Sequence, residues 1–213
     1  MKHLQVAYIP AENIVNGVDS ARVLLNDQPK QYIDNLLWSI TGYKPDVAFA
    51  MAYTDDSILL KYYVTEEHVK ASYNEINDPV FKDTCVEFFV AFDGGDKYYN
   101  LEFNCIGTPL IAYGSGKNDR VYLDRPVIEL IDTHHYIADS DIEDMYYWEL
   151  TLQIPFTVFT HHHITSLQNQ ECCANFFKCG DDLPEPHFLS WNNIEHTDPN
   201  FHLPQFFEKI IFA

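Results

Sequence analysis

The chain has 213 residues, of which 46% are hydrophobic and 21% are charged, and its formal net charge is −19. This composition is typical of a soluble globular protein, and a chain of this length can bury enough surface to fold without disulfides or metals. The acidic charge disfavours nucleic acid and anionic membranes as partners, because it repels phosphate. We therefore expect a single domain over residues 1–213 that binds neither nucleic acid nor anionic membranes.

Short strand-like segments run through most of the chain. In chain order they cover residues 47–53, 57–64, 84–92, 97–105, 120–131, 146–156, 171–179, 187–191 and 206–212. Turn residues separate them, most clearly the DGGD sequence at 93–96. Only two short stretches, near 30–38 and 66–76, favour helix. Many short strands and 15% aromatic residues predict an all-β protein, built as an antiparallel β-sandwich with minor short helices.

Two of the predicted strands carry carboxylates within apolar sequence. Side chains alternate between the two faces of a strand, so Glu87 lies opposite the apolar row of 84–92, and Glu102 lies opposite the core face of 97–105. If these strands pair, Glu87 and Glu102 share one face of the sheet. Burying a carboxylate without a partner is costly, so Glu87 should have one. We expect this face to be a polar patch away from the hydrophobic core.

The carboxylates and two loop aromatics allow several interpretations. Paired carboxylates could be the acid and nucleophile of a glycoside hydrolase, hydrogen-bond acceptors for sugar hydroxyls, or members of a solvated sheet face. Phe81 and Phe201 favour a pocket, because each follows an Asp-Pro pair in a predicted loop. Pro199 and Pro204 exclude a helix and disfavour a strand around Phe201. Its ring therefore either fills the core or is exposed as a platform for a ligand.

The cysteines and the first residues of the chain indicate the cellular compartment of the protein. The odd number of cysteines, five, argues against a complete set of disulfides, and we expect buried, reduced thiols. Cys172, Cys173 and Cys179 form a poor zinc set, because adjacent residues of a strand point to opposite faces. The first residues contain no apolar segment of signal-peptide length. We expect a cytoplasmic protein, with export left open if the natural start differs.

Four segments together resemble the family 9 carbohydrate-binding modules. They are DTCVEFFVAFDGGDKYYNLEFNCIGT, WELTLQIPF, ANFFKCGDDLPEPHFLSW and FHLPQFFEKIIF, and they keep the order of the family motifs. The resemblance covers roughly residues 35–213, and the chain looks similar to stand-alone family-9-like proteins of gut bacteria. It implies a β-sandwich that binds a mono- or oligosaccharide and has no catalytic residues.

The resemblance also implies which residues bind the ligand. They are Phe81, Glu87, Glu102, Asn104, Asn175 and Phe201. In the xylanase-borne members two tryptophans sandwich the sugar, and Phe81 and Phe201 match their motif positions. Phenylalanine offers less stacking area than tryptophan, and Glu102 stands where the family has a basic residue. The affinity or the ligand class is therefore expected to differ.

Two alternatives and one cofactor question stay open at this point. A glycoside hydrolase would use Glu87 and Glu102. A haem- or metal-binding sandwich of the related larger group would use histidine and methionine ligands such as Met51, but the sequence identifies no ligand pair. The structural calcium sites of the family cannot be traced here, so we expect no cofactor, with calcium as the alternative.

Overall fold

The structure is a computed structural model that describes residues 3–94 and 96–213. The DGGD turn expected at 93–96 therefore lies partly outside the described residues. The strands on either side of it pair as predicted, with Val90 opposite Tyr99. None of the helices in the described part of the chain is long and apolar enough to cross a membrane.

Among the residues that the structure describes, six strands form the first sheet. In order they are β10 (Asp132–Asp139), β11 (Tyr146–Pro155), β5 (Ser57–Glu66), β4 (Asp46–Tyr53) and β1 (Leu4–Tyr8), with the short β2 (Gln31–Tyr32) also on β4. The sheet is amphipathic because side chains alternate between its faces. The helix α1 (Val18–Leu24) contacts β10 and β11, and its buried Ala21 belongs to an apolar cluster that also contains the alanines of β4.

The second sheet carries the functional region. Its main order is β1, β14 (Glu208–Phe212), β12 (Glu171–Cys179), β6 (Cys85–Ala91), β7 (Tyr98–Asn104), β8 (Pro109–Gly114) and β9 (Val121–Tyr122). Two short strands extend it, because β13 (Phe188–Ser190) pairs with β12 and β3 (Asn35–Leu37) pairs with β13. The order β12, β6, β7 places three side-chain rows next to one another on each face.

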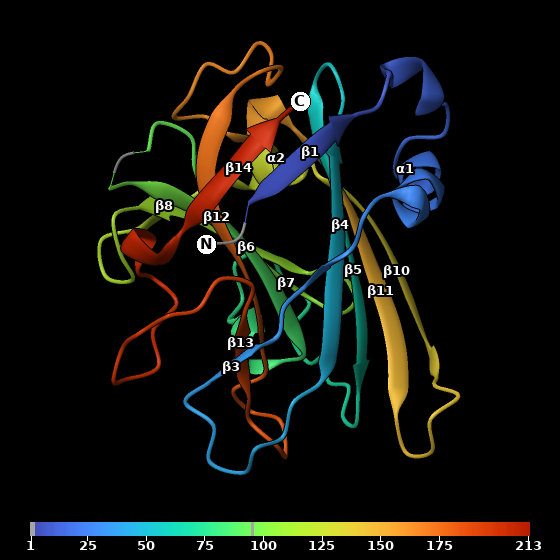
Figure 1. Ribbon diagram of the computed structural model, residues 1–213, viewed down its shortest axis with the longest axis vertical. Helices are drawn as coiled ribbons and strands as arrows, with labels where there is room; N and C mark the ends of the chain where they lie inside the picture. Colours follow the sequence, from blue (N-terminus) through green and yellow to red (C-terminus); the bar gives the residue numbers. More distant parts are fainter. Residues whose placement is uncertain (1–2, 95) are drawn as a thin grey trace.

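The two sheets share strand β1, as Figure 1 shows. This strand pairs in parallel with β14, where Leu4 lies opposite Ile210, and in parallel with β4, where Tyr8 lies opposite Tyr53. The other pairings among the described strands are antiparallel. The predicted β-sandwich is therefore confirmed, but the sheet is mixed rather than purely antiparallel.

The main hydrophobic core lies between the two sheets. Tyr99, Leu101 and Phe103 of β7 point into it, as their alternation predicts, and Phe49 stacks on Phe176 across the sheets with ring centroids 3.8 Å apart. Met51, considered above as a metal ligand, is part of this core. A thioether packed among hydrocarbon side chains contributes dispersion contacts and apolar burial.

The helix predictions are wrong in position. Helix was expected near 30–38 and 66–76, where the structure instead has β2 and β3 and an irregular segment. The predicted strand 120–131 contains the short β9 followed by α2 (Arg125–Ile128). Proline in its first turn explains α2, because that position needs no amide donor, whereas a strand interior would. The 3-10 helices are Ala11–Asn13, Leu25–Asp27, Val80–Lys82, Phe156–Val158 and Pro204–Phe206.

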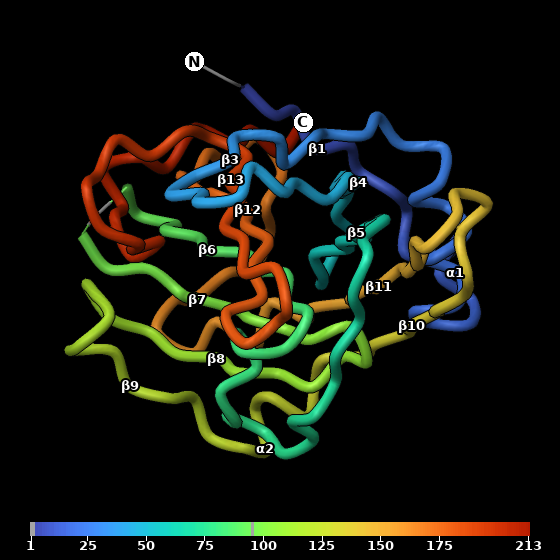
Figure 2. The backbone as a smooth tube through the Cα atoms, turned by 90° about the horizontal axis from the view of Figure 1, so that it is seen from below, coloured from blue at the N-terminus to red at the C-terminus, as the bar shows by residue number. Residues whose placement is uncertain are grey.

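The outer face of the second sheet is covered, which corrects the expected polar patch. A second apolar cluster lies on it, with Phe89 of β6, Phe177 of β12 and Tyr98 of β7 packed against Phe201 and Phe207 of the C-terminal segment. Figure 2 shows this segment, in red, beside β6 and β7. The loop aromatics thus bury the row of polar side chains that alternation alone would leave in water.

Candidate functional site

A cavity of about 280 Å³ lies over the outer face of β6, β7 and β12. Its lining consists of Trp38, Phe81, Glu87, Glu102, Lys117, Arg120, Cys179, Asp181, Phe188, Pro199, Asn200, Phe201 and His202. The strands supply the floor, and loops far apart in the sequence supply the walls. Four of the six residues predicted to bind a ligand therefore meet in one place.

The two predicted clamp phenylalanines both line the cavity but differ in burial. Phe81 lies in the 3-10 helix Val80–Lys82 and is half-buried. Phe201 is only 8% exposed and stacks on Phe177, with ring centroids 4.2 Å apart and planes 12° apart. Of the two interpretations of Phe201 that the sequence left open, the structure shows a ring that is largely buried yet still lines the cavity. One face of its ring is covered by the protein, so only the remaining surface is free for a ligand.

Trp38 is a third aromatic residue of the cavity, and sequence reasoning missed it. It follows β3, is half-buried, and its backbone φ is +47°, which is uncommon for a bulky residue. The indole Nε1 donates to the carbonyl oxygen of His196 at 2.7 Å, and the ring lies 5.9 Å from that of Phe201. These contacts fix the indole beside Phe201. Nothing local in the sequence around Trp38 indicates this loop geometry.

Glu87 and Glu102 form the floor, directly opposite each other on β6 and β7. Both are nearly fully buried, at 3% and 2% exposure. Glu102 accepts hydrogen bonds from Arg120 Nη1 at 2.8 Å and from Asn100 Nδ2 at 2.9 Å. Glu87 accepts one from the Cys179 thiol at 3.2 Å. The predicted shared face is confirmed, but the two carboxyl groups have unlike partners.

Because their partners differ, the pKa values of the two carboxyl groups are shifted to different extents. Burial, and next the Glu102 carboxylate, raise the pKa of Glu87 well above its usual value. Burial also raises the pKa of Glu102, but Arg120 opposes this rise by its charge and its hydrogen bond. A guanidinium favours the ionised form, whereas a thiol does little for it. We interpret Glu102 as the charged member of the pair and Glu87 as the neutral one.

Arg120 connects the floor to the C-terminal wall. Its Nη1 lies 3.3 Å from His202 Nε2, and His202 Nδ1 lies 2.8 Å from the Tyr98 hydroxyl. Burial, and then the charge of Arg120, lower the pKa of His202 to about 3, so the ring is neutral. Arginine can only donate, so Nε2 accepts and Nδ1 donates to Tyr98. Gly114 allows this approach, since a Cβ there would lie 2.5 Å from the Arg120 Cα.

The rim of the cavity carries further charges. Lys117 is exposed on the loop between β8 and β9, and Asp181 is half-buried after β12. Burial is the main reason that the pKa of Asp181 is raised to about 6, and Lys117 opposes it. The cavity lining thus contains both cationic side chains, Lys117 and Arg120, and carboxyl groups.

Asn104 and Asn175 do not line the cavity. Asn104 Nδ2 donates to the Tyr73 carbonyl at 2.8 Å, and its Oδ1 accepts from the Thr108 amide at 2.9 Å. Asn175 Oδ1 accepts from the Asn192 amide at 2.9 Å, and its Nδ2 donates to the Asn192 carbonyl at 3.0 Å. Both amides are used to hold the covering loops against the sheet, so any effect on a ligand would be indirect.

The fold and its cavity can be compared with known proteins. The model of carbohydrate-binding family 9 matches residues 19–212. A presumed carbohydrate-binding protein from Bacteroides uniformis is 36% identical, with a TM-score of 0.90, and the match covers 100% of this chain and 99% of that one. Among curated proteins, none matches this chain.

Two more distant solved structures share the fold. A family 9 carbohydrate-binding module from Caldicellulosiruptor kristjanssonii in complex with glucose is 11% identical, with a TM-score of 0.63, over 100% of this chain and 96% of that one. A family 9 module from the same organism in complex with cellotriose is 12% identical, with a TM-score of 0.60, over 99% of this chain and 93% of that one.

Proposed function

This chain belongs to carbohydrate-binding family 9, and from that premise we propose that it binds a sugar in the cavity over β6, β7 and β12 without catalysing a reaction. One observation carries the proposal. Four tryptophan and phenylalanine side chains, Trp38, Phe81, Phe188 and Phe201, line a single cavity together with a buried carboxylate–guanidinium pair. Rings that pack on the apolar faces of a sugar, together with groups that bond its hydroxyls, are the two elements that sugar recognition needs.

The size of the cavity favours a small ligand or the end of a chain. Its volume of about 280 Å³ is at the lower limit of small-molecule pockets, which run from roughly 300 to 1,000 Å³. Phe201 is covered by Phe177 on one face, so it offers one surface to a sugar. Trp38, held by its bond to His196, supplies the larger ring. Trp38 thus takes over part of the stacking surface that the family tryptophans provide.

The polar groups of the floor would set the orientation of the sugar. Glu102 is held by Arg120 and Asn100, and its Oε2 is buried with no hydrogen-bond partner. A buried acceptor without a partner costs free energy, which a sugar hydroxyl would recover on binding. Glu87, as a neutral acid, would donate to a sugar oxygen rather than accept from a hydroxyl.

The arrangement of the carboxyl groups argues for binding rather than hydrolysis. A glycosidase places its two carboxyl groups on either side of the scissile bond. Glu87 and Glu102 lie side by side on neighbouring strands, both beneath the ligand space. Glu102 is also engaged by Arg120, which would hinder a role as nucleophile. We expect no turnover of aryl glycosides, and turnover lost in Glu87→Gln or Glu102→Gln would establish the hydrolase instead.

Calorimetric titration with glucose, cellotriose and a panel of other mono- and oligosaccharides tests the proposal. Phe81→Ala should abolish measurable binding, because it removes one aromatic wall. Phe92→Ala is the matched control, since Phe92 is also a half-buried phenylalanine but lies outside the cavity. No binding by the parent protein, or an equal loss in both variants, would contradict the proposal.

Tryptophan fluorescence gives an independent measurement. Trp148 and Trp191 are fully buried in the main core, whereas Trp38 lines the cavity. A sugar in the cavity should therefore change the emission of Trp38 alone. The change should disappear in Trp38→Phe and persist in Trp191→Phe. A fluorescence change that survives Trp38→Phe would place the ligand elsewhere.

A further inference from the structure

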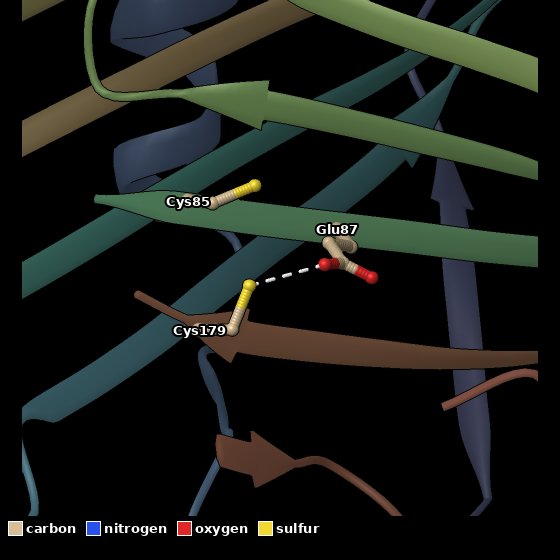
Figure 3. A group of neighbouring side chains, drawn as sticks. All are labelled: Cys85, Glu87 and Cys179. Atoms are coloured by element: carbon tan, nitrogen blue, oxygen red, sulfur yellow. Dashed lines mark hydrogen bonds between the residues drawn. The ribbon is translucent and has the colours of Figure 1, made fainter. Parts of the chain in front are cut away.

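Three potential metal ligands converge beneath the cavity. Cys85 and Glu87 lie two residues apart on β6, so they point to the same face, and Cys179 of β12 lies directly opposite Cys85. One ligand atom from each, two thiol sulfurs and a carboxylate oxygen, lie within 4.8 Å of one another. Figure 3 shows the Cys179 sulfur directed at the Glu87 carboxyl group, at 3.2 Å.

We propose that Cys85, Cys179 and Glu87 form a binding site for a divalent transition-metal ion of the zinc type. Two thiolates and one carboxylate are ligands that Zn²⁺ accepts, usually with four ligands in all. Thiolates select such an ion against Ca²⁺ and Mg²⁺, which prefer oxygen ligands. The site is therefore distinct in chemistry from the calcium sites considered in the sequence analysis.

The surroundings of Glu87 support the proposal. The side chain is 3% exposed, and among the described residues its carboxyl group has no cation within ion-pairing distance. Its one hydrogen bond comes from a thiol, which is a weak donor. A neutral cluster of two thiols and a carboxylic acid is the alternative without metal. That alternative leaves a buried acid poorly satisfied, whereas a metal ion would satisfy all three groups at once.

An ion could reach this site and retain an open position. Glu87 and Cys179 both line the cavity, whereas Cys85 does not. The cavity therefore provides an entry path, and a fourth ligand would come from the cavity side, as water or as a bound molecule. Arg120, which lies on the Glu102 side of the floor, offsets part of the negative charge of the thiolates. Each ligand releases its proton to solvent as the metal binds.

Cobalt titration of the full chain tests this site without any sugar, so its outcome is independent of the proposed function. The protein is first reduced and freed of metal with a chelator. Co²⁺ should then produce the visible bands of four-coordinate cobalt and a near-ultraviolet sulfur-to-cobalt charge-transfer band. Zn²⁺ should displace the cobalt and abolish both signals, whereas Ca²⁺ should not. Cobalt spectra without the sulfur band, or displacement by Ca²⁺, would overturn the proposal.

Variants locate the ligands. Cys85→Ser, Cys179→Ser and Glu87→Gln should each weaken cobalt binding by at least about 10–100-fold, the loss that follows removal of even an outer-sphere partner. Cys105→Ser is the matched control, because Cys105 is also a fully buried thiol but lies in the main core. Circular dichroism verifies the fold of each variant. Equal cobalt binding by the cluster variants and the control would contradict the site.

Discussion

The sandwich buries carboxylates in two regions that are built differently. In the core cluster, Glu66 of β5 pairs with Lys178 of β12 at 2.9 Å, and both side chains are fully buried. Trp148 Nε1 donates to Glu66 at 2.6 Å, and Lys178 lies 2.8 Å from His187 Nε2. Burial and the charge of Lys178 lower the pKa of His187 to about 3, so this ring is neutral.

The cavity cluster lies on the outer face of the second sheet, whereas Lys178 of the core cluster lies on its inner face. Cys179 follows Lys178 directly in β12, so the two side chains point to opposite faces. Here Arg120 pairs with Glu102, whereas among the described residues Glu87 has no cation within ion-pairing distance and Glu102 Oε2 has no hydrogen-bond partner. The core cluster has one carboxylate for one ammonium and is sealed. The cavity cluster has an excess of carboxyl groups and an opening.

The contrast distinguishes a structural polar cluster from one that can accept a ligand. In the core cluster every charge has its counterpart, so a further molecule has nothing to add. In the cavity cluster Glu102 Oε2 has no hydrogen-bond donor and the Glu87 carboxyl group has no cation. A bound ligand could supply the donor, and a bound ion could supply the positive charge. Unequal charge beside a cavity is thus a better indication of function here than burial alone.

The largest expected effect comes from breaking the core pair. Lys178→Met should lower the free energy of unfolding by about 3–5 kcal/mol, because it leaves the Glu66 carboxylate buried without a counterion. Arg120→Met in the cavity cluster should cost only about 1–2 kcal/mol, since water can enter the cavity and reach Glu102. Urea denaturation compares the two variants. Equal losses would show that the cavity cluster is as closed as the core cluster.

Phe201→Ala should have the next largest effect. It should cost about 3 kcal/mol of unfolding free energy, because the ring is packed on Phe177, and it should also remove sugar binding. Phe81→Ala should cost about 1 kcal/mol, since its ring is half-exposed, with the same loss of binding. Thermal unfolding and calorimetry on both variants check this. A Phe201→Ala protein of parental stability would mean that the ring is not held against Phe177 in solution.

The raised pKa of Asp181 predicts a pH-dependent stability. The folded-state pKa of about 6 lies above the usual value of 3.8, so folding favours the protonated form. This contribution is complete below about pH 4 and is lost as the pH rises through about 6. Asp181→Asn should therefore exceed the parent in stability above pH 6 by about 1–2 kcal/mol, after allowance for the partly exposed position.

Thermal unfolding of the Asp181 variant and the parent across this pH range provides the measurement. The two curves should converge in acid and separate as the pH rises. Asp182→Asn is the matched control, because Asp182 is adjacent but exposed and lies near Lys70 and Lys82. A constant difference between Asp181→Asn and the parent at every pH would exclude titration of Asp181 as the cause.

The smallest expected effect separates the two floor carboxyl groups. Glu102→Gln should weaken sugar binding about tenfold, or about 1.4 kcal/mol, because it removes the charge that Arg120 supports. In the metal-free protein, Glu87→Gln should change the affinity less than about twofold, because an amide resembles the neutral acid in shape and can still donate. Calorimetric titration of both variants with sugar measures this difference in affinity. A larger loss for Glu87→Gln would show that Glu87 is the ionised member in the complex.

Sequence periodicity predicted the strands of the cavity floor, because the position of a residue within a strand determines the face to which its side chain points. The period-two pattern of β6 and β7 and the hairpin between them placed Glu87 and Glu102 on one face, as the register confirms. The walls could not be predicted in this way. Trp38, Arg120 and His202 come from loops on distant parts of the chain, and only tertiary packing brings them to the floor.

Burial was the second property that the sequence left open. Phe201 lies outside regular structure, as the neighbouring prolines indicate, although a 3-10 helix begins at Pro204; the direction of its ring depends on Phe177, which belongs to another element. The polar row of β7 was expected to be exposed to water. The alternation of side chains shows which residues of a strand share a face, but it does not show whether another segment covers that face. Asn100, Glu102 and Asn104 are instead buried under the loops that form the cavity walls.

The shared strand β1 has a consequence for the order of folding. It pairs with β14 near the opposite end of the sequence, as Leu4 opposite Ile210 shows, and also with β4. Contacts at such separation form slowly, because the intervening chain must first be ordered. Until residues 208–212 leave the ribosome, one side of β1 has no partner and is an open edge that another chain could extend. The chain is therefore open to association through this edge until β14 is in place, and removal of residues 4–8 would instead leave unpaired the edges of β4 and β14 that β1 covers.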